Sequence, residues 1–424
     1  MQPVPKLVSP IILVLAMALA LGAATTNAWS AAMTPDKKEK PAAKKDPAGK
    51  PSPAMPASPP ATAAGSGKPT FDTAARNALV LDFQSGAVLL DKNADQRIPT
   101  ASMSKIMTAY QVYIYLREGK AKLDDMLPVS EKAWRTGGSK MFVPYPGQVK
   151  VEDLLRGMII QSGNDACVVL AEGLAGSVEA FVEQMNDTAQ KMGLSNSHFA
   201  NVDGLPDPNH YMSARDLVTL SRHLITDFPQ FYRYEAEKEF AYGGIKQGNR
   251  NPLLYKDLGA DGIKTGHTDE AGYGLVGSAM RNGRRVIFVI SGLASMNARA
   301  SESERLLDWA YREFEDVTVA KAGAAVDDAP VWLGTAGVVS VSTARDAVVT
   351  LPRGSRRGVK VTAIYNGPIP APVAAGAPVG TLQVTAPFVD PFEFPLVALT
   401  SVDRLGPIGR AAQGVAYFLL EKKN

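Results

Sequence analysis

Two residues three positions apart, Ser102 and Lys105, form the first group in this chain that could carry chemistry. A proline and Thr100 precede them, and these residue types favour the start of a helix, with Thr100 as the cap of its first N–H groups. Apolar residues then recur at three- and four-residue spacing as far as Tyr110, which predicts a helix with one buried face. On such a helix Ser102 lies beside Lys105, whereas Ser104 points elsewhere.

A serine beside a lysine is an activated nucleophile when the surroundings disfavour the lysine's charge, because the neutral amine can accept the hydroxyl proton. The same pair also occurs by chance on solvated helix faces, so its meaning depends on partners elsewhere in the chain. Two groups follow in chain order: Ser162-Gly163-Asn164 between predicted helices, and Lys264-Thr265-Gly266 on a predicted strand. Their order and their structural contexts favour a nucleophilic serine over coincidence.

The composition describes an ordinary globular protein with room for more than one domain: 424 residues, 46% of them hydrophobic and 21% charged. A formal net charge of +3 is too small to indicate a nucleic-acid partner. Cys167 is the only cysteine and histidine is scarce, so an intramolecular disulfide is impossible and a metal site is not expected. Cys167 lies in an apolar helical run and is predicted to be a buried, inert thiol. No cofactor is expected.

Residues 1–32 have the parts of a secretory signal: Lys6, an apolar run over 11–21, and small residues up to Ala28 and Ala32. The run is short for a membrane-spanning helix, so cleavage near one of these alanines is expected, with an uncleaved anchor as the alternative. Residues 33–69 are rich in Pro, Ala and Lys and cannot bury enough apolar surface to fold, which predicts a linker. The protein is therefore expected to be exported.

Residues 70–316 are predicted to form one α+β domain, with an antiparallel sheet flanked by helices. One hairpin is expected over 78–90 and a second over 262–290, around an Asn282-Gly283 turn. Strands on both sides of a helical block imply that both ends of the domain complete one sheet. Apolar spacing predicts helices over 151–158, 165–174, 181–192, 213–224 (capped by Ser213) and 301–314.

After the α+β domain, short β-rich runs alternate with Gly and Pro, which predicts a small all-β sandwich over 317–404. Residues 405–424 show helical spacing of apolar residues, followed by Glu421-Lys422-Lys423. Such an amphipathic helix could lie in a membrane interface, although alanine and glycine dilute its apolar face. A weak peripheral membrane anchor and a helix that only docks on the protein are the two alternatives.

The chain resembles the low-molecular-weight penicillin-binding proteins that are D-alanyl-D-alanine carboxypeptidases, from about Asn77 to the C-terminus. Besides the three groups above, the resemblance rests on segments 213–216, 261–268, 306–309 and 351–354. It implies a transpeptidase-like domain of the penicillin-binding-protein/β-lactamase type, a β-sandwich and a terminal membrane-contacting helix. It also implies a periplasmic or cell-surface location, peptidoglycan stem peptides ending in D-alanyl-D-alanine as substrates, and β-lactams as covalent inhibitors.

This resemblance assigns a role to each residue of the three groups. Ser102 is expected to attack the carbonyl between the last two D-alanines and to form an acyl-enzyme, which water then hydrolyses. Lys105 accepts the serine's proton, and Ser162 relays a proton to the departing D-alanine with the help of the Lys264 charge. Asn164 is expected to hold a substrate amide and to orient Lys105.

Further residues are expected to bind the substrate's oxygens. The backbone N–H groups of Ser102 and His267 are the expected oxyanion hole. Thr265, followed by Gly266, is expected to bind the terminal carboxylate that distinguishes a carboxypeptidase substrate. Arg299 matches an arginine that shares this task in the family, and a planar guanidinium suits a carboxylate. A surface salt bridge is the alternative for Arg299.

Three other functions compete with this interpretation. A class A β-lactamase normally has Ser-Asp-Asn and a separate glutamate for deacylation, whereas this chain has Gly163 in the middle position and an additional β module. An endopeptidase of the same superfamily typically lacks the β module. A non-catalytic wall-binding scaffold is disfavoured because the set Ser102, Lys105, Ser162, Asn164 and Lys264 is complete.

Overall fold

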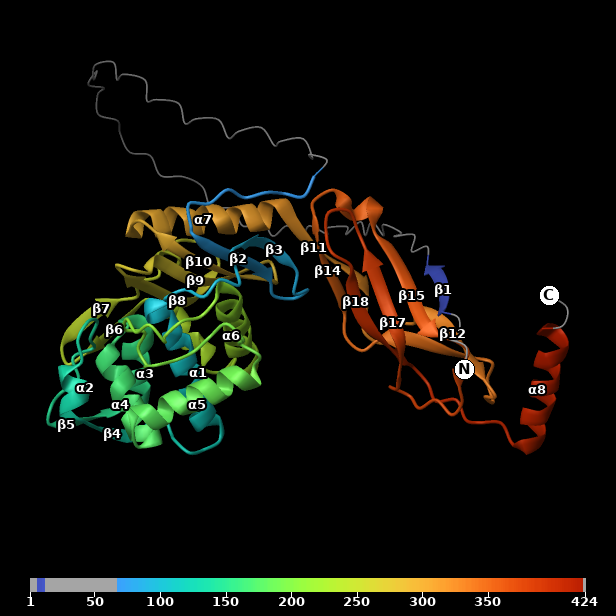
Figure 1. Cartoon of the computed structure of the whole chain (residues 1–424), viewed down its shortest axis with the longest axis horizontal. Coiled ribbons are helices and arrows are strands. Elements are labelled where there is room, and N and C mark those ends of the chain that lie inside the picture. The colour runs from blue at the N-terminus through green and yellow to red at the C-terminus, as the bar shows by residue number, and fades with distance from the viewer. Residues whose placement is uncertain (1–5, 12–66, 422–424) are drawn as a thin grey trace, which may run out of the picture. The chain divides into compact units, whose positions relative to one another are not determined.

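The computed structural model describes residues 6–11 and 67–421 (Figure 1). Most of the predicted signal and of the predicted linker therefore lies outside the described residues. Within the predicted signal, strand β1 (Lys6–Ile11) pairs antiparallel with β15 (Lys360–Asn366). From residue 67 onward, the chain forms an α+β domain, an all-β domain and a terminal helix, which confirms the predicted fold class.

One five-stranded sheet organises the α+β domain, and each of its neighbouring strand pairs is antiparallel. The tight turn between the long strands β9 and β10 has positive φ at Asn282 (51°) and Gly283 (79°), as a two-residue hairpin turn of the predicted type requires. Strand β8 lies at the free edge of the sheet. The order is β3 (Val88–Lys92), β2 (Asn77–Asp82), β10 (Arg284–Leu293), β9 (Gly272–Arg281) and β8 (Ala260–Thr268).

Both faces of this sheet are covered, so its central strand is apolar without interruption from Val286 to Ile290. On one face Phe288 packs in a cluster with Leu306 and Leu307 of helix α7 (Met296–Glu313). On the other face Ile287 joins the core formed by the remaining helices. Figure 1 shows α7 running across one side of the sheet, with the helical block on the opposite side.

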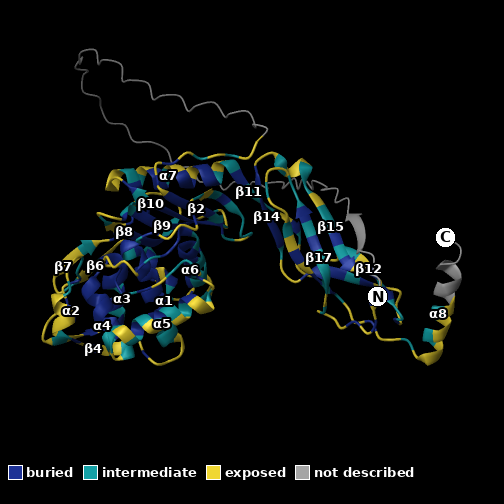
Figure 2. Ribbon diagram, in the orientation of Figure 1, coloured by how far each residue is buried: buried dark blue, intermediate teal, exposed yellow. Residues whose placement is uncertain are grey.

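The predicted helices are present in the helical block, and their buried residues form its interior (Figure 2). The Ser213 hydroxyl caps α6 by accepting the Asp216 N–H at 3.1 Å, as expected. Helix α7 begins at Met296, earlier than predicted, because Ser295 caps it. The 3₁₀ helix η3 (Pro252–Tyr255) packs instead with α7 through Leu253. The block contains α1 (Lys105–Arg117), α2 (Glu131–Arg135), α3 (Val151–Ile160), α4 (Asn164–Ala175), α5 (Val178–Lys191), α6 (Ala214–Asp227) and the 3₁₀ helices η1 (Ala101–Ser104) and η2 (Tyr232–Ala236).

The start of the Ser102 helix differs from the prediction. Ser102 lies in the 3₁₀ turn η1, and the α-helix proper begins at Lys105. Thr100 does not cap it: its backbone is already helical (φ −91°, ψ −11°), whereas a capping residue needs an extended backbone. The buried Thr100 hydroxyl has no hydrogen-bond partner among the described residues.

The C-terminal domain is all-β, as predicted, and its two sheets share one apolar cluster that includes Val341, Val349 and Leu382. A short 3₁₀ helix, η4 (Ser355–Gly358), links β14 to β15. Two small hairpins, β4 (Met126–Val129) with β5 (Gly147–Lys150) and β6 (Glu239–Tyr242) with β7 (Ile245–Gly248), belong to the first domain. The C-terminal strands are β11 (Phe314–Ala320), β12 (Asp327–Trp332), β13 (Val338–Thr343), β14 (Ala347–Pro352), β15, β16 (Ile369–Pro370), β17 (Pro378–Thr385) and β18 (Phe392–Ala398).

The terminal helix α8 (Pro407–Glu421) leaves Ile408 87% exposed and Val415 61% exposed. In the part of the chain that the structure describes, none of the helices has the length and apolar character needed to cross a membrane. The predicted terminal helix is therefore present, and these two apolar side chains on it are exposed.

Candidate active site

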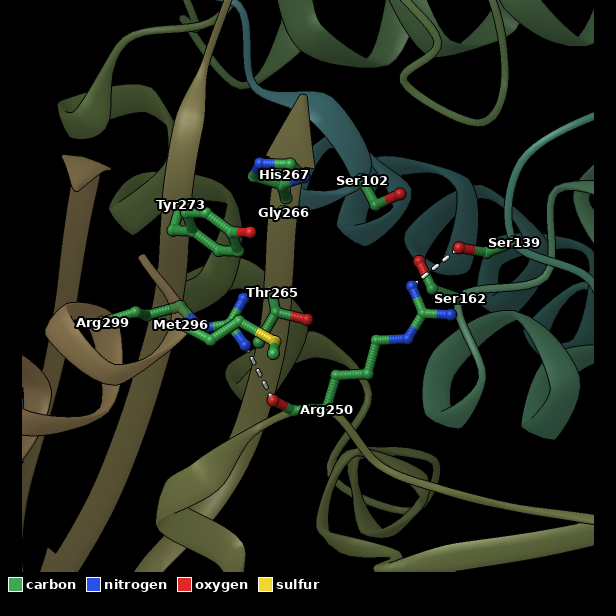
Figure 3. A pocket seen from close by; sticks show the side chains of 10 residues that line it. All are labelled: Ser102, Ser139, Ser162, Arg250, Thr265, Gly266, His267, Tyr273, Met296 and Arg299. Atoms are coloured by element: carbon green, nitrogen blue, oxygen red, sulfur yellow. Dashed lines mark hydrogen bonds between the residues drawn. The ribbon is translucent and has the colours of Figure 1, made fainter. Parts of the chain in front are cut away.

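A cleft of about 400 Å³ opens where edge strand β8 passes η1, and it gathers residues from all three sequence groups (Figure 3). Ser102 comes from η1, Ser162 from the loop before α4, and Thr265, Gly266 and His267 from β8. Arg299 of α7 lies on the far side of β8 from Ser102 in this view. The remaining lining residues are Ser139, Arg250, Tyr273 and Met296.

Gly266 lets the strand approach the nucleophile's turn. A Cβ atom at this position would lie 2.7 Å from the Thr100 carbonyl oxygen and 3.0 Å from the Met103 side chain. Real Cβ atoms do not tolerate the first distance, so any larger residue would push β8 away from η1. The glycine of the Lys-Thr-Gly group is thus a packing requirement of the cleft.

The side chain of Lys105 is buried and holds Ser102 at hydrogen-bond distance, with 2.8 Å between Nζ and Oγ. The same nitrogen lies 2.7 Å from Asn164 Oδ1 and also donates to the carbonyl oxygen of Asp203. The Asn164 amide is fixed in turn, because its Nδ2 donates to the Gly137 carbonyl at 2.8 Å. The lysine nitrogen therefore has three defined neighbours, one of which is the serine hydroxyl.

Burial lowers the pKa of Lys105, because the charged form loses its hydration. The negative charge of nearby Asp203 opposes this effect, and the positive charge of Arg250 adds to it. Cys167 is itself fully buried and its pKa is raised to about 12, so the thiol stays protonated, as predicted for an inert cysteine. The site thus favours the neutral amine that a general base requires.

Ser162 and Lys264 form the second hydrogen-bonded pair of the cleft, with 3.0 Å between Lys264 Nζ and Ser162 Oγ. Ser162 has a positive φ of 61°, an uncommon backbone conformation for a residue with a side chain. Lys264 also donates to the Thr265 carbonyl at 3.3 Å. Burial lowers the pKa of Lys264 well below its usual value, and the positive charges of Lys105 and Arg250 lower it further.

The loop over 137–146 is fastened to the helix that carries Asn164. The Asp165 carboxylate accepts the backbone N–H groups of Met141 at 2.9 Å, Phe142 at 2.8 Å and Val143 at 3.2 Å. Gly163 makes this arrangement possible, because a Cβ there would lie 2.9 Å from Asp165 Oδ1 and 3.0 Å from the Met141 nitrogen. This close packing explains why glycine occupies the middle of the Ser-Gly-Asn group.

Two arginines line the cleft beside Thr265. Arg299 is only 6% exposed, which does not fit a surface salt bridge, and its Nη2 donates to the Arg250 carbonyl at 3.3 Å. Its Nε has no hydrogen-bond partner among the described residues. Arg250 Nη1 donates to the Ser139 hydroxyl at 2.7 Å, across the cleft from Arg299 (Figure 3). Burial lowers the pKa of both guanidinium groups.

His267 stacks on Tyr273, its cross-strand partner on β9, with ring centroids 3.9 Å apart. The two rings form one wall of the cleft, and the Arg299 guanidinium lies 5.8 Å from the Tyr273 ring centroid. Such stacking fixes the imidazole against its neighbour. This arrangement accords with a role for the His267 backbone rather than for a free imidazole base.

Sequence reasoning missed several residues that build the cleft, because they lie in loops without periodicity. Asp203 contributes a backbone carbonyl, and the following Gly204 has a φ of +77°. A Cβ at Gly204 would lie 2.0 Å from the Ala101 carbonyl oxygen, so this loop fits against η1 only with glycine. Ser139 and Arg250 carry no motif, and only their place in the fold identifies them.

Comparison with known proteins agrees with this geometry. The model of the D-alanyl-D-alanine carboxypeptidase family matches residues 62–295, and that of the penicillin-binding protein 5 C-terminal domain matches residues 314–404. D-alanyl-D-alanine carboxypeptidase DacC of Escherichia coli is 41% identical over 344 residues, which cover 79% of this chain and 86% of that protein. DacA of Haemophilus influenzae is 39% identical, with coverage of 79% and 87%.

Solved structures give the same result. Penicillin-binding protein 5 from Haemophilus influenzae is 38% identical and has a TM-score of 0.76, over 80% of this chain and 100% of that chain. Penicillin-binding protein D2 from Listeria monocytogenes, solved in its ampicillin-bound form, is 31% identical with a TM-score of 0.53, over 57% of this chain and 98% of that chain. The chain belongs to the D-alanyl-D-alanine carboxypeptidase family. It is a serine peptidase with that activity and carries the family's C-terminal β domain.

Proposed function

We propose that this enzyme removes the terminal D-alanine of peptidoglycan stem pentapeptides through an acyl-enzyme on Ser102. The observation that carries the proposal is the Ser102–Lys105 pair beside a cleft that is lined by Arg250 and Arg299 and has no carboxylate in its described lining. A cationic cleft beside a nucleophile suits a peptide whose scissile bond is one residue from a free carboxylate.

The three neighbours of Lys105 Nζ define its role as the base. A neutral amine has two N–H bonds and one lone pair. Asn164 Oδ1 and the Asp203 carbonyl can only accept, so they take the two N–H bonds. The lone pair is left for the Ser102 hydroxyl, 2.8 Å away. The proton of Ser102 then moves to Lys105 as Oγ bonds to the substrate carbonyl carbon.

Collapse of the tetrahedral intermediate breaks the carbon–nitrogen bond, and the departing D-alanine nitrogen needs a proton. Ser162 can donate its hydroxyl proton to that nitrogen and regain the proton that Lys105 took from Ser102, which leaves Lys105 neutral again. The Lys264 ammonium, 3.0 Å from Ser162 Oγ, supports this transfer electrostatically. Water then attacks the acyl carbon as Lys105 accepts its proton. When the bond between the acyl carbon and Ser102 Oγ breaks, Lys105 returns that proton to Oγ, which releases the shortened peptide and restores Ser102.

The substrate's oxygens have matching groups in the cleft. We assign the backbone N–H groups of Ser102 and His267 to the oxyanion, where charge develops as the carbonyl is attacked. Thr265 and Arg299 bind the terminal carboxylate. Arg250 lies opposite Arg299 and is a further candidate for this carboxylate.

β-Lactams are expected to acylate the same serine, because they resemble a D-alanyl-D-alanine terminus. The related Listeria protein with bound ampicillin supports this expectation. The β domain disfavours the endopeptidase alternative, whose members typically lack such a domain, and Gly163 disfavours the β-lactamase alternative. The complete set of catalytic groups disfavours a non-catalytic scaffold.

We further propose that the enzyme is exported and acts at the outer face of the cytoplasmic membrane, in the periplasm or at the cell surface. The signal-like residues 1–32 support export. The exposed apolar side chains of Ile408 and Val415 on α8 support weak peripheral contact with lipid.

The decisive experiment incubates the purified protein with a pentapeptide ending in D-alanyl-D-alanine and follows the products by mass. Loss of one D-alanine is the expected result, and cleavage of cross-linked dimers alone would favour an endopeptidase. Ser102→Ala should abolish both this release and labelling by a fluorescent penicillin, because no other hydroxyl takes its place beside Lys105. Labelling that persists in this variant would contradict the assignment of the nucleophile.

A further inference from the structure

One buried carboxyl group lies outside the motif set and behind the cleft. Glu235 belongs to η2 and is 2% exposed. Burial raises its pKa to about 8, and the positive charge of Lys264 is the strongest influence that opposes this rise. Burying an acid is costly unless its charge has a partner or a task. The catalytic roles of Ser102, Lys105, Ser162 and Lys264 do not account for the burial of the Glu235 carboxyl group.

The packing of η2 places Glu235 on the side of the sheet from which Lys264 projects. Lys264 pairs with Val276 across strands β8 and β9, and paired residues share one face of a sheet. Val276 lies in the apolar core of the helical block together with Tyr113 and Tyr234. Helix η2 also touches β8 directly, because a Cβ at Gly262 would lie 3.3 Å from the Glu235 Cβ.

The groups that face Glu235 come from α1, β8 and its own element. Tyr113 of α1 lies beside the carboxyl group, Lys264 of β8 is the cation, and the Glu235 charge also acts on Tyr232 of η2. Helix α3 also packs here, but its Glu152 and Arg156 bind other partners. Those partners are Tyr234 for Glu152 and Glu237 for Arg156.

A nearby carboxylate would stabilise the charged form of Lys264. Both hydrogen-bond acceptors described for its ammonium group, the Ser162 hydroxyl and the Thr265 carbonyl, are neutral. The cations Lys105 and Arg250 destabilise its charge, and Glu235 is the group that stabilises the charge most. The carboxylates that raise the pKa of Lys105, in contrast, are Asp203 and Asp165 rather than Glu235.

We propose that Glu235 is a positioning residue for the reaction: its carboxylate keeps the shared positive charge of the site on Lys264 and so leaves Lys105 as the neutral base. This inference rests on the proposed function, because it concerns the same two lysines. The ammonium groups of Lys105 and Lys264 repel each other, so the pair retains one positive charge more easily than two. A negative group on the Lys264 side decides which lysine retains it.

The Glu235 carboxylate should shift the pH dependence of the rate in one direction. Burial raises the pKa of Glu235 to about 8, so its carboxylate forms as the pH rises through that value and acts on the lowered pKa of Lys264 from there upward. Its negative charge raises the pKa of Lys264 and extends activity to higher pH. Removing the carboxylate lowers that pKa, so the alkaline limb of the rate profile must move to lower pH. Below about pH 7 the carboxyl is mostly protonated in the wild type, and a neutral substitute changes little.

The test compares wild type with Glu235→Gln from pH 6 to pH 10. The first measurement is D-alanine release from the pentapeptide, and the second is the rate of acylation by a fluorescent penicillin. In Glu235→Gln we expect the alkaline limb to move down by about one pH unit, roughly a tenfold rate loss on that limb. At pH 6 the rate should stay within about threefold of the wild type.

Glu237→Gln is the matched control, because it removes a carboxylate two residues away that pairs with Arg156 instead of Lys264. Its alkaline limb should not move. Glu235→Asp, which keeps the charge, should restore most of the limb. A Glu235→Gln profile that coincides with wild type, or one lowered equally at every pH, would overturn the proposal. A wild type that is acylated by penicillin yet releases no D-alanine would instead refute the proposed function, and the acylation profiles would still test Glu235.

Discussion

The α+β domain and the β domain bury different kinds of side chain. In the described part of the α+β domain, ionisable groups such as Lys105, Asp165, Glu235 and Lys264 lie below the surface beside the apolar core. The buried polar residues of the β domain are three hydroxyl residues, Ser342, Thr343 and Thr350. Because a buried charge costs several kcal/mol unless it is paired, the first domain sacrifices stability where its chemistry requires it. The second has the composition of a structural module.

A substitution in the α+β domain should lower both activity and stability. Gly204→Ala would place a methyl group against the Ala101 carbonyl and strain a residue with φ of +77°. The loop must then shift, and with it the Asp203 carbonyl that holds Lys105. We expect kcat/KM for the pentapeptide to fall at least about tenfold, with a loss of about 1–3 kcal/mol in the free energy of unfolding.

Gly193→Ala is the control for this variant, because its φ of +73° is similar but no atom lies within 4 Å of the added methyl group. Backbone strain should lower its free energy of unfolding by a comparable amount, but its kcat should not change. Steady-state kinetics and chemical denaturation measure the two effects separately. Equal kinetic losses in both variants would mean that backbone strain, rather than the contact with η1, controls the position of the base.

A substitution in the core of the β domain, in contrast, should lower stability without lowering activity. Leu382 is fully buried in the cluster of the β domain, so Leu382→Ala should destabilise that domain by about 2–4 kcal/mol. Since its core buries no catalytic group, kcat of the folded protein should stay within about twofold of wild type. Thr381→Ala, on the same strand, should cost far less stability. A large fall in kcat without unfolding would show that the β domain shapes the cleft.

The smallest effect on catalysis is expected from the terminal helix, which contributes to neither core. Truncation after Gly406 removes α8 and its exposed Ile408 and Val415. We expect unchanged kinetics on a soluble pentapeptide and a shift of the protein from membrane fractions to the soluble fraction. Fractionation followed by penicillin labelling measures both. An unchanged distribution would leave docking as the role of the helix.

The sequence predicted the regular elements and the members of the motif groups, because both leave signals in residue spacing. Helical periodicity located α3 to α6, and the Asn282-Gly283 turn located the β9–β10 hairpin. The missed features depend on contacts between distant loops. Gly204 is constrained by Ala101, about a hundred positions earlier, and Glu235 gains its meaning only from Lys264. The Thr100 cap failed because the 3₁₀ turn already gives that residue a helical backbone.

The three hydrogen bonds that the loop over 137–146 donates to the Asp165 carboxylate have a consequence for substrate access. Asp165 directly follows Asn164, so a loop movement that broke these bonds would also disturb the amide that orients Lys105. We therefore expect that widening the cleft by a movement of this loop would also displace the base. On this basis we expect the enzyme to favour slender, free peptide ends over bulky polymer segments.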